Sequence, residues 1–378
     1  MAQRDRARRE RQVMYDGQTQ KKRDYVGVLS SVFAIIIGLL VGFVILLLSN
    51  PSQAVPGFIT ILTGALTHGL KGVGQVFYYA TPIILTGLSV GFAFKTGLFN
   101  IGTPGQFIVG AFAAVYVGIM WKGLGPVHWA AALLAAVLGG ALWGMVPGLL
   151  KAYFNVNEVI ASIMMNYIGM YMVNWIVKSY KPLFNNLRNE SRNVASTAQI
   201  PKMGMDRLFP ESSVNGGILI AIATVILIWV ILNKTTFGYE LKAVGFNRDA
   251  SKYAGINEKK SIIMSMVIAG AIAGMAGGLL YLAGTGKHIE IKDVLASEGF
   301  TGISVALLGL SHPIGVLFSG IFIAYLTAGG FYLQLFEFST EIIDIIVAVI
   351  IYFSAFALIV KTILTRVNKN REKGGGQS

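Results

Sequence analysis

The chain has 378 residues, of which 54% are hydrophobic and only 13% are charged, with 31 basic residues against 18 acidic ones. Soluble globular proteins carry about 25% charged residues, so this chain has too few charges to cover a water-soluble fold. Its mean hydropathy of +0.64 agrees with a protein that is partly solvated by lipid. The absence of cysteine excludes disulfides and thiolate chemistry, and the four histidines lack the spacing of a metal site.

Ten apolar segments have the composition of transmembrane helices, which need about 20 residues to cross the hydrocarbon core. The first, 26–48, exceeds the apolar run of a cleaved signal peptide and lacks a cleavage site, so we expect it to remain as an anchor. The others are 73–94, 104–120, 128–150, 158–177, 215–232, 261–284, 299–310, 314–334 and 341–360. The sequence therefore predicts an all-α polytopic membrane protein of about ten transmembrane helices. Segment 55–70 is expected to form an additional re-entrant or surface helix.

The basic residues predict the orientation of the chain. If the spans alternate from a cytoplasmic N-terminus, most lysines and arginines lie on the cytoplasmic side, chiefly in 1–25, 233–260 and 362–378. Both termini are then cytoplasmic tails that flank a membrane domain, 26–361, with an external segment at 178–214. The basic run RDRARRERQ in the first tail faces anionic lipid headgroups, which argues against a nucleic-acid partner.

The spans also divide into two similar groups. Residues 73–177 and 261–360 each contain four spans that cross in opposite senses, and the first and sixth spans complete two inverted five-helix halves. In each half a short third span contains a similar string, PGQFIVGA at 104–111 and SEGFTGIS at 297–304. Inverted pairs of interrupted helices near the midplane form the solute site of many transporters. Chance similarity between glycine-rich spans is the alternative.

Two local signals concern helix packing and helix ends. Gly270, Gly274 and Gly278 are spaced four residues apart, which allows helix backbones to approach closely, so packing explains them better than ligand binding. Asn155 followed by Glu158 matches the pattern of a capped helix N-terminus.

A protein that moves solute uphill needs an energy source, and the spans contain almost none of the ionisable side chains that ion-coupled carriers bury. Asp344, about one turn inside the last span, is the serious candidate, although a carboxylate at a helix N-terminus explains it better. The string Gly286-Lys287-His288 does not complete a phosphate-binding loop. If ATP drives transport, another polypeptide therefore hydrolyses it.

The longest cytoplasmic connection, 233–260, is too long for a simple turn. Within it, Asn247 is expected to cap a short helix from Arg248 to Ala254, which Gly255 ends. A short amphipathic helix here fits a partner protein and the membrane surface equally well.

Four strings, taken together, resemble permeases of the branched-chain amino acid, ribose and nucleoside import group of ABC transporters. They are NIGTPGQFIVGA at 100–111, NEVIASIMMNYI at 157–168, GYELKAVGFNRDASKYAGI at 238–256, and GFTGISVALLG followed by HPIG within 299–315. The second string, the long external segment and the basic N-terminal extension are most similar to nucleoside permeases. The group often has an acidic residue where this chain has Thr103-Pro104, so no role of that acid is transferred.

The resemblance implies a multi-pass permease subunit of a bacterial inner membrane, which is not an enzyme and binds no cofactor itself. ATP and magnesium would belong to a partner ATPase. A second permease subunit, identical or related, and an extracytoplasmic solute-binding protein or lipoprotein would complete the importer. The external segment 178–214 is either a landing surface for that protein or a solvated loop. The coupling helix of the family corresponds here to Asn247, Arg248, Asp249, Ala250, Ser251, Lys252, Tyr253, Ala254 and Gly255.

Nucleosides are the favoured cargo, and branched-chain amino acids or sugars are the alternative; an ion-coupled carrier or a channel is a weaker possibility. The solute path is expected where polar or flexible residues interrupt the apolar spans. These residues are Asn100, Gly102, Gly105, Gln106, Asn166 and Thr301. Amide side chains suit sugar hydroxyls or base edges, and glycine permits irregular backbone. Tyr167 and Phe107 can stack on a base, but packing is the commoner role of such aromatic residues.

Overall fold

The computed structural model describes residues 32–33, 35–339, 342, 345–346, 348–349, 352–353 and 362. The predicted N-terminal tail, Asp344, most of the last span and nearly all of the C-terminal tail lie outside these residues. The part of the chain that is described is dominated by helices, as predicted for an all-α membrane protein.

The first group of helices follows the predicted spans closely. An apolar helix, Ile35–Ser49, precedes α2 (Ala54–Thr67), α3 (Gly69–Lys95), α4 (Thr103–Met120), the 3-10 helix η1 (Lys122–Val127), α5 (His128–Phe154) and α6 (Glu158–Ser179). The segment after α6 contains two short strands, β1 (Phe184–Asn185) and β2 (Glu190–Ser191), the 3-10 helix η2 (Ser196–Ala198) and α7 (Met205–Leu208).

The second group begins with α8 (Gly217–Lys234). It continues with α9 (Thr236–Phe246), α10 (Arg248–Tyr253), α11 (Glu258–Tyr281), α12 (Ser297–Leu308), α13 (Pro313–Phe331) and the 3-10 helix η3 (Tyr332–Phe336). Seven of the described helices are long and apolar enough to cross a membrane, namely α3, α4, α5 with η1, α6, α8, α11 and α13 with η3. These confirm seven of the predicted spans, but ten transmembrane helices are not confirmed.

The predicted span 299–310 is wrong as a complete crossing. Helix α12 has 12 residues, so it is about 18 Å long and cannot cross a hydrocarbon core of about 30 Å. The chain turns immediately afterwards at Leu310 and Ser311, which both adopt positive φ angles. Helix α2, with 14 residues, is the additional helix expected near 55–70 and is likewise shorter than a membrane span.

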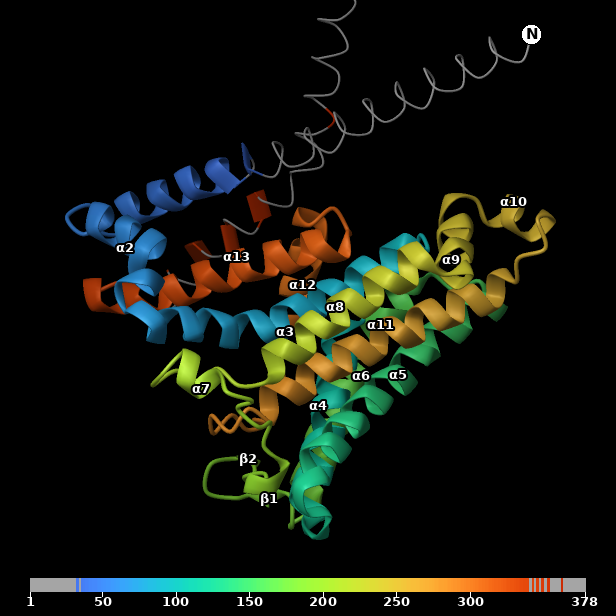
Figure 1. Cartoon of the computed structure of the whole chain (residues 1–378), viewed down its shortest axis with the longest axis horizontal. Coiled ribbons are helices and arrows are strands. Elements are labelled where there is room, and N and C mark those ends of the chain that lie inside the picture. Colours follow the sequence, from blue (N-terminus) through green and yellow to red (C-terminus); the bar gives the residue numbers. More distant parts are fainter. Residues whose placement is uncertain are drawn as a thin grey trace, which may run out of the picture.

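The helices pack in two matching sets. Helix α11 lies along α4 and α5, and α3 correspondingly lies along α12 and α13 (Figure 1). Helices α3 and α11 also contact each other, as do α4 and α12. The main contacts are therefore retained when α3, α4 and α5 are exchanged with α11, α12 and α13.

Glycines bring α5 and α11 into close contact, as the spacing of Gly270, Gly274 and Gly278 predicts. A Cβ atom built on Gly274 would lie 2.3 Å from the carbonyl oxygen of Ala136, and one on Gly140 would lie 2.2 Å from that of Gly270. Only glycine allows this separation, because a side chain on either residue would overlap the opposite backbone.

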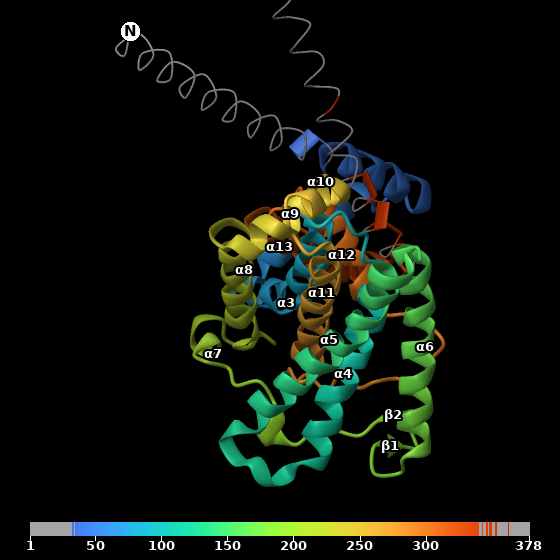
Figure 2. The ribbon, with the colours of Figure 1, turned by 90° about the vertical axis from the view of Figure 1, so that its right-hand side faces the viewer.

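The connections between helices gather at two opposite ends of the bundle (Figure 2). The strands and η1 lie at one end, where the amide of Ser191 donates to the carbonyl of Ile289 at 2.9 Å. Helices α9 and α10 lie at the other end, where a Cβ on Gly245 would lie 2.4 Å from the carbonyl oxygen of Lys95. We call the end that contains the strands and η1 the strand end, and the end that contains α9 and α10 the α10 end.

Candidate functional site

A polar cluster holds the start of α4. The Nδ2 atom of Asn100 donates to Oε1 of Gln106 at 2.9 Å, and Nε2 of Gln106 donates back to Oδ1 of Asn100 at 3.1 Å. The same oxygen of Asn100 accepts from the amide of Gly102 at 3.1 Å. Both side chains are buried. They stabilise the irregular backbone that precedes α4, where an apolar side chain would leave amide groups unpaired.

Helix α6 contributes Asn166 to the same cluster. Its Oδ1 atom accepts from the amide of Gly105 at 2.9 Å, and its Nδ2 atom donates to the carbonyl of Ile101 at 2.9 Å. A Cβ on Gly105 would lie 2.8 Å from the Cα atom of Asn166, so the contact requires glycine. The structure thus brings together five of the six residues predicted for the solute path. The sixth, Thr301, lies on α12 and donates to the carbonyl of Ser297 in its own helix.

Ser162 is a member of this region that the sequence analysis missed. It lies one helical turn before Asn166, and its buried hydroxyl has no hydrogen-bond partner in the described part of the chain. A Cβ on Gly102 would lie 3.2 Å from the Cβ atom of Ser162. The signal available in the sequence was the spacing of four residues, which places Ser162 and Asn166 on one face of α6.

The starts of α4 and α12 meet within the bundle. A Cβ on Gly299 would lie 2.6 Å from the backbone nitrogen of Pro104, so the backbones of the two helix starts touch without an intervening side chain. These residues belong to the two similar strings noted in the sequence. Helix N-termini carry partial positive charge, and opposed interrupted helices are the arrangement in which many transporters bind solute. No three histidine, aspartate and glutamate side chains among the described residues group closely enough to hold a metal ion.

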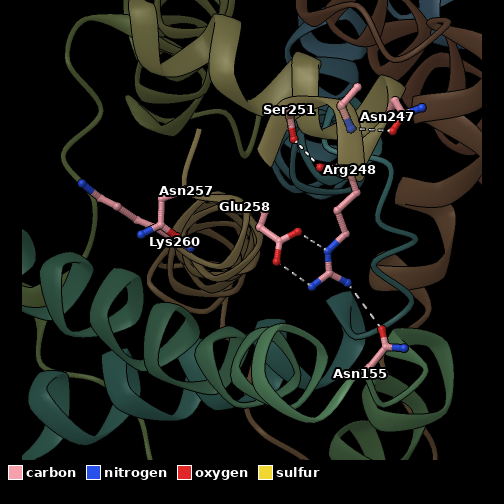
Figure 3. Close-up of polar contacts among 8 residues, drawn as sticks. Asn155, Asn247, Arg248, Ser251, Asn257, Glu258 and Lys260 are labelled. Carbon is pink, nitrogen blue, oxygen red and sulfur yellow. Dashed lines mark hydrogen bonds and ion pairs between the residues drawn. The ribbon is translucent and has the colours of Figure 1, made fainter. Parts of the chain in front are cut away.

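Helix α10 forms at the opposite end of α4 from the strands, with the caps that the sequence predicts. The Oδ1 atom of Asn247 accepts from the amide of Ala250 at 2.9 Å (Figure 3). The helix ends at Tyr253, with Ala254 as its cap, and Gly255 follows with φ of 82°. A left-handed residue after the last turn is the usual stop signal, and glycine adopts it without steric cost.

Arg248 ties α10 to the rest of the protein. Its guanidinium binds Glu258 of α11 through two contacts, Nε to Oε2 at 2.7 Å and Nη2 to Oε1 at 3.2 Å (Figure 3). A third contact joins Nη1 to Oδ1 of Asn155 at 3.4 Å. The hydrogen bond to Glu258 raises the pKa of Arg248 above its ordinary value, so the guanidinium stays charged. Arg248 therefore fixes the position of α10 on the bundle.

The predicted role of Asn155 as the N-cap of α6 is wrong. Asn155 ends α5 in a left-handed conformation, with φ of 52°, and Asn157 instead caps α6 by accepting from the amide of Val159 at 2.9 Å. Asparagine suits both positions, since it tolerates positive φ and also accepts hydrogen bonds at helix starts. Two asparagines separated by one residue make the pattern ambiguous.

An apolar hollow of about 510 Å³ lies between α9 and α10. It is bordered by the aromatic side chains of Tyr239 and Phe246, and Tyr253 is the last residue of α10 but does not line the hollow. Phe246 and Tyr253 are 90% and 94% exposed, respectively. Large exposed aromatic groups around a hollow are characteristic of a protein-binding surface. The sequence analysis included Tyr253 in this surface but missed Tyr239 and Phe246.

Comparison with known proteins shows which family and which relatives this chain resembles. The family model for the permease component of branched-chain amino acid transport systems matches residues 72–355. The chain is similar to the guanosine ABC transporter permease protein NupP of Bacillus subtilis, with 38% identity over 347 residues, 90% of this chain and 97% of that protein.

Two further relatives differ in the solute that their names give. The nucleoside ABC transporter permease protein NupB of Lactococcus lactis is 33% identical over 90% of this chain and 93% of its own length. The glucose ABC transporter permease protein TsgB13 of Haloferax volcanii is 30% identical over 75% of each chain. No solved structure matches this chain.

Proposed function

The chain belongs to the family of permease components of branched-chain amino acid transport systems, and on that basis we propose that it forms the translocation path of an ABC importer for nucleosides. Two of its relatives carry guanosine or nucleoside in their names and align over almost their full length. The family description and the glucose permease support branched-chain amino acids or sugars as the alternative cargo. The strongest support for this function is the similarity to NupP over 90% of the chain.

A separate ATPase is proposed to bind the surface formed by residues 247–255 together with Tyr239 and Phe246. The exposed aromatic residues and the hollow between α9 and α10 support this docking. ATP and magnesium would act on that partner, and this chain would contribute no catalytic residue. Arg248, which is paired internally with Glu258, would position the surface and not contact the ATPase directly.

The full assembly is proposed to lie in a bacterial inner membrane with both termini of this chain in the cytoplasm. The matched contacts of α3–α5 and α11–α13 support two halves of similar packing, and their inversion is part of the proposal. A second permease subunit, identical or related, would complete the path. A solute-binding protein would deliver cargo to the strand end, where segment 178–214 lies.

The solute is proposed to pass the junction of α4 and α12, which lies beside the predicted path residues. In this proposal Asn100, Gln106 and Asn166 act through their hydrogen bonds by holding the backbone open around Gly102 and Gly105. The role of Thr301 in the path stays a prediction.

The function is tested by uptake into proteoliposomes that contain this chain, its partner permease, the ATPase and the binding protein. We expect saturable, ATP-dependent accumulation of labelled guanosine that exceeds that of glucose and leucine and resists a protonophore. Accumulation of leucine or glucose without guanosine would contradict the choice of cargo. Uphill uptake by the permease in the absence of any ATPase would instead support an ion-coupled carrier.

The position of α10 should depend on the ion pair between Arg248 and Glu258. We expect Arg248→Glu to lower ATP-driven uptake about tenfold, because a bidentate charge-assisted contact is replaced by repulsion between carboxylates. The charge-swapped double variant with Glu258→Arg should recover most of the uptake. Lys260→Glu is the matched control, since Lys260 is exposed on α11 and forms no ion pair within the described residues. Equal defects in the single and double variants would contradict a positioning role.

A further inference from the structure

A second cavity, of about 300 Å³, lies near the strand end between α4, α6, α11 and the start of α12. Its volume is at the lower end of the range of small-molecule sites, about 300–1,000 Å³. Glu298, on its wall, directly precedes Gly299, which touches Pro104. The cavity therefore ends at the junction where the two helix starts meet.

The inner wall of this cavity is apolar and contains an aromatic ring. Ile108 of α4, Met170 of α6 and Tyr281 of α11 line it. The ring of Tyr281 packs edge-on against that of Phe107, with ring centroids 6.4 Å apart at an interplanar angle of 61°. The hydroxyl of Tyr281 forms no hydrogen bond with any residue that the structure describes. A fixed aromatic ring with a free hydroxyl offers both a surface for a planar group and one hydrogen bond.

The rim of the cavity is polar but its charges are balanced. Nζ of Lys287 lies 3.0 Å from Oε1 of Glu298, and Nζ of Lys292 lies 3.0 Å from Oε2 of Glu290. Since each lysine is paired with a glutamate, the rim does not favour a ligand with a large net charge such as a nucleotide. Ion pairs that are partly exposed contribute little stability, so an incoming hydroxyl can displace Lys287 from Glu298 at small cost.

We infer that this cavity is a solute-binding site on the extracytoplasmic half of the path, and that it accepts a neutral nucleoside. The base lies against Tyr281, and the neighbouring sugar hydroxyls donate to the carboxylate of Glu298, as acidic residues bind ribose in other proteins. Asn174 adds an acceptor, because its Nδ2 atom donates to the carbonyl of Lys292 and its Oδ1 atom has no hydrogen-bond partner within the described residues. This inference rests on the proposed function.

The absence of cysteine from this chain permits a direct test. Val294→Cys introduces a thiol at an exposed position of the cavity wall, and Leu187→Cys introduces one on the strand-end surface outside the cavity. We expect guanosine to slow modification of the first thiol by a methanethiosulfonate reagent at least fivefold in the assembled complex and to leave the second unchanged. Modification is read on this chain by mass spectrometry, so cysteines of partner subunits do not interfere.

Side-chain variants then test the assigned contacts. In the Val294→Cys background, Glu298→Gln should raise the guanosine concentration for half protection about tenfold, and Tyr281→Phe about threefold or more. Tyr78→Phe is the matched control, because the Tyr78 hydroxyl is bonded to Thr285 at 3.0 Å and does not line this cavity. The guanosine concentration for half protection should stay unchanged in that variant.

The outcomes separate this inference from the proposed function. If the complex accumulates guanosine but guanosine does not protect the thiol at position 294, the binding site is overturned and the importer stands. The binding site is also overturned, and the importer stands, if Glu298→Gln, Tyr281→Phe and Tyr78→Phe all need the same guanosine concentration for half protection. If the unmodified complex accumulates no nucleoside at all, the result contradicts the proposed function itself.

Discussion

Replacing Phe246 and Tyr253 together by alanine should nearly abolish ATP-driven uptake while the permease still folds. Both side chains are almost fully exposed, so their removal leaves no cavity in the protein interior. Aromatic residues at the centre of an interface commonly contribute about 2 kcal/mol or more each to binding. We therefore expect at least a hundredfold loss of affinity for the ATPase in the double variant.

The measurement is co-purification of the ATPase with the permease, followed by solute-stimulated ATP hydrolysis in proteoliposomes. Leu187→Ala is the control, because Leu187 is an equally exposed apolar side chain at the strand end. Its ATPase recovery should match that of the unmodified chain. Normal recovery and normal coupling in the Phe246→Ala, Tyr253→Ala variant would show that the ATPase binds elsewhere.

Gly274→Ala should prevent the correct packing of α5 against α11. The added Cβ atom would lie 2.3 Å from the carbonyl oxygen of Ala136 and 2.8 Å from the Cα atom of Gly140. Both are backbone atoms, which cannot rotate away as a side chain can, so the helices must separate. Overpacking of this kind costs about 3 kcal/mol, and close backbone approach is a main source of helix association in lipid.

We expect this variant to give little monodisperse protein in detergent and a clearly lower thermal stability than the unmodified chain. Gly123→Ala is the matched control, since a Cβ atom there meets nothing within 4 Å. It should leave both the yield and the melting temperature unchanged. Equal stability of the two variants would mean that α5 and α11 do not approach as closely as described.

The sequence located the elements whose signals are local. Composition and long apolar runs predict seven spans that the structure contains, because a helix in lipid must expose apolar side chains along its whole length. The cap at Asn247 and the stop at Gly255 were also predictable, since both act within one helical turn. By contrast, segment 299–310 was wrongly counted as a complete span, because an apolar run does not show that α12 is only 12 residues long and starts against Pro104 inside the bundle.

The polar cluster at α4 illustrates the limit of sequence reasoning about the site. Asn100, Gln106 and Asn166 stood out as polar residues in apolar spans, and the structure does bring them together. Their hydrogen bonds, however, are made with the backbone and with one another, across as many as 65 residues of sequence. A residue type can indicate that a polar group needs partners, but it cannot identify partners so distant in the chain.

By itself the sequence determined that this chain is a helical membrane protein of the permease type, with a capped helix in the segment 233–260. Only the tertiary structure decided that Arg248 is paired with Glu258, that Phe246 and Tyr253 are exposed, and that a cavity lies beside Tyr281. The physical reason is that apolar length and capping are local properties, whereas ion pairing, burial and cavities depend on helices that are distant in sequence and adjacent in space.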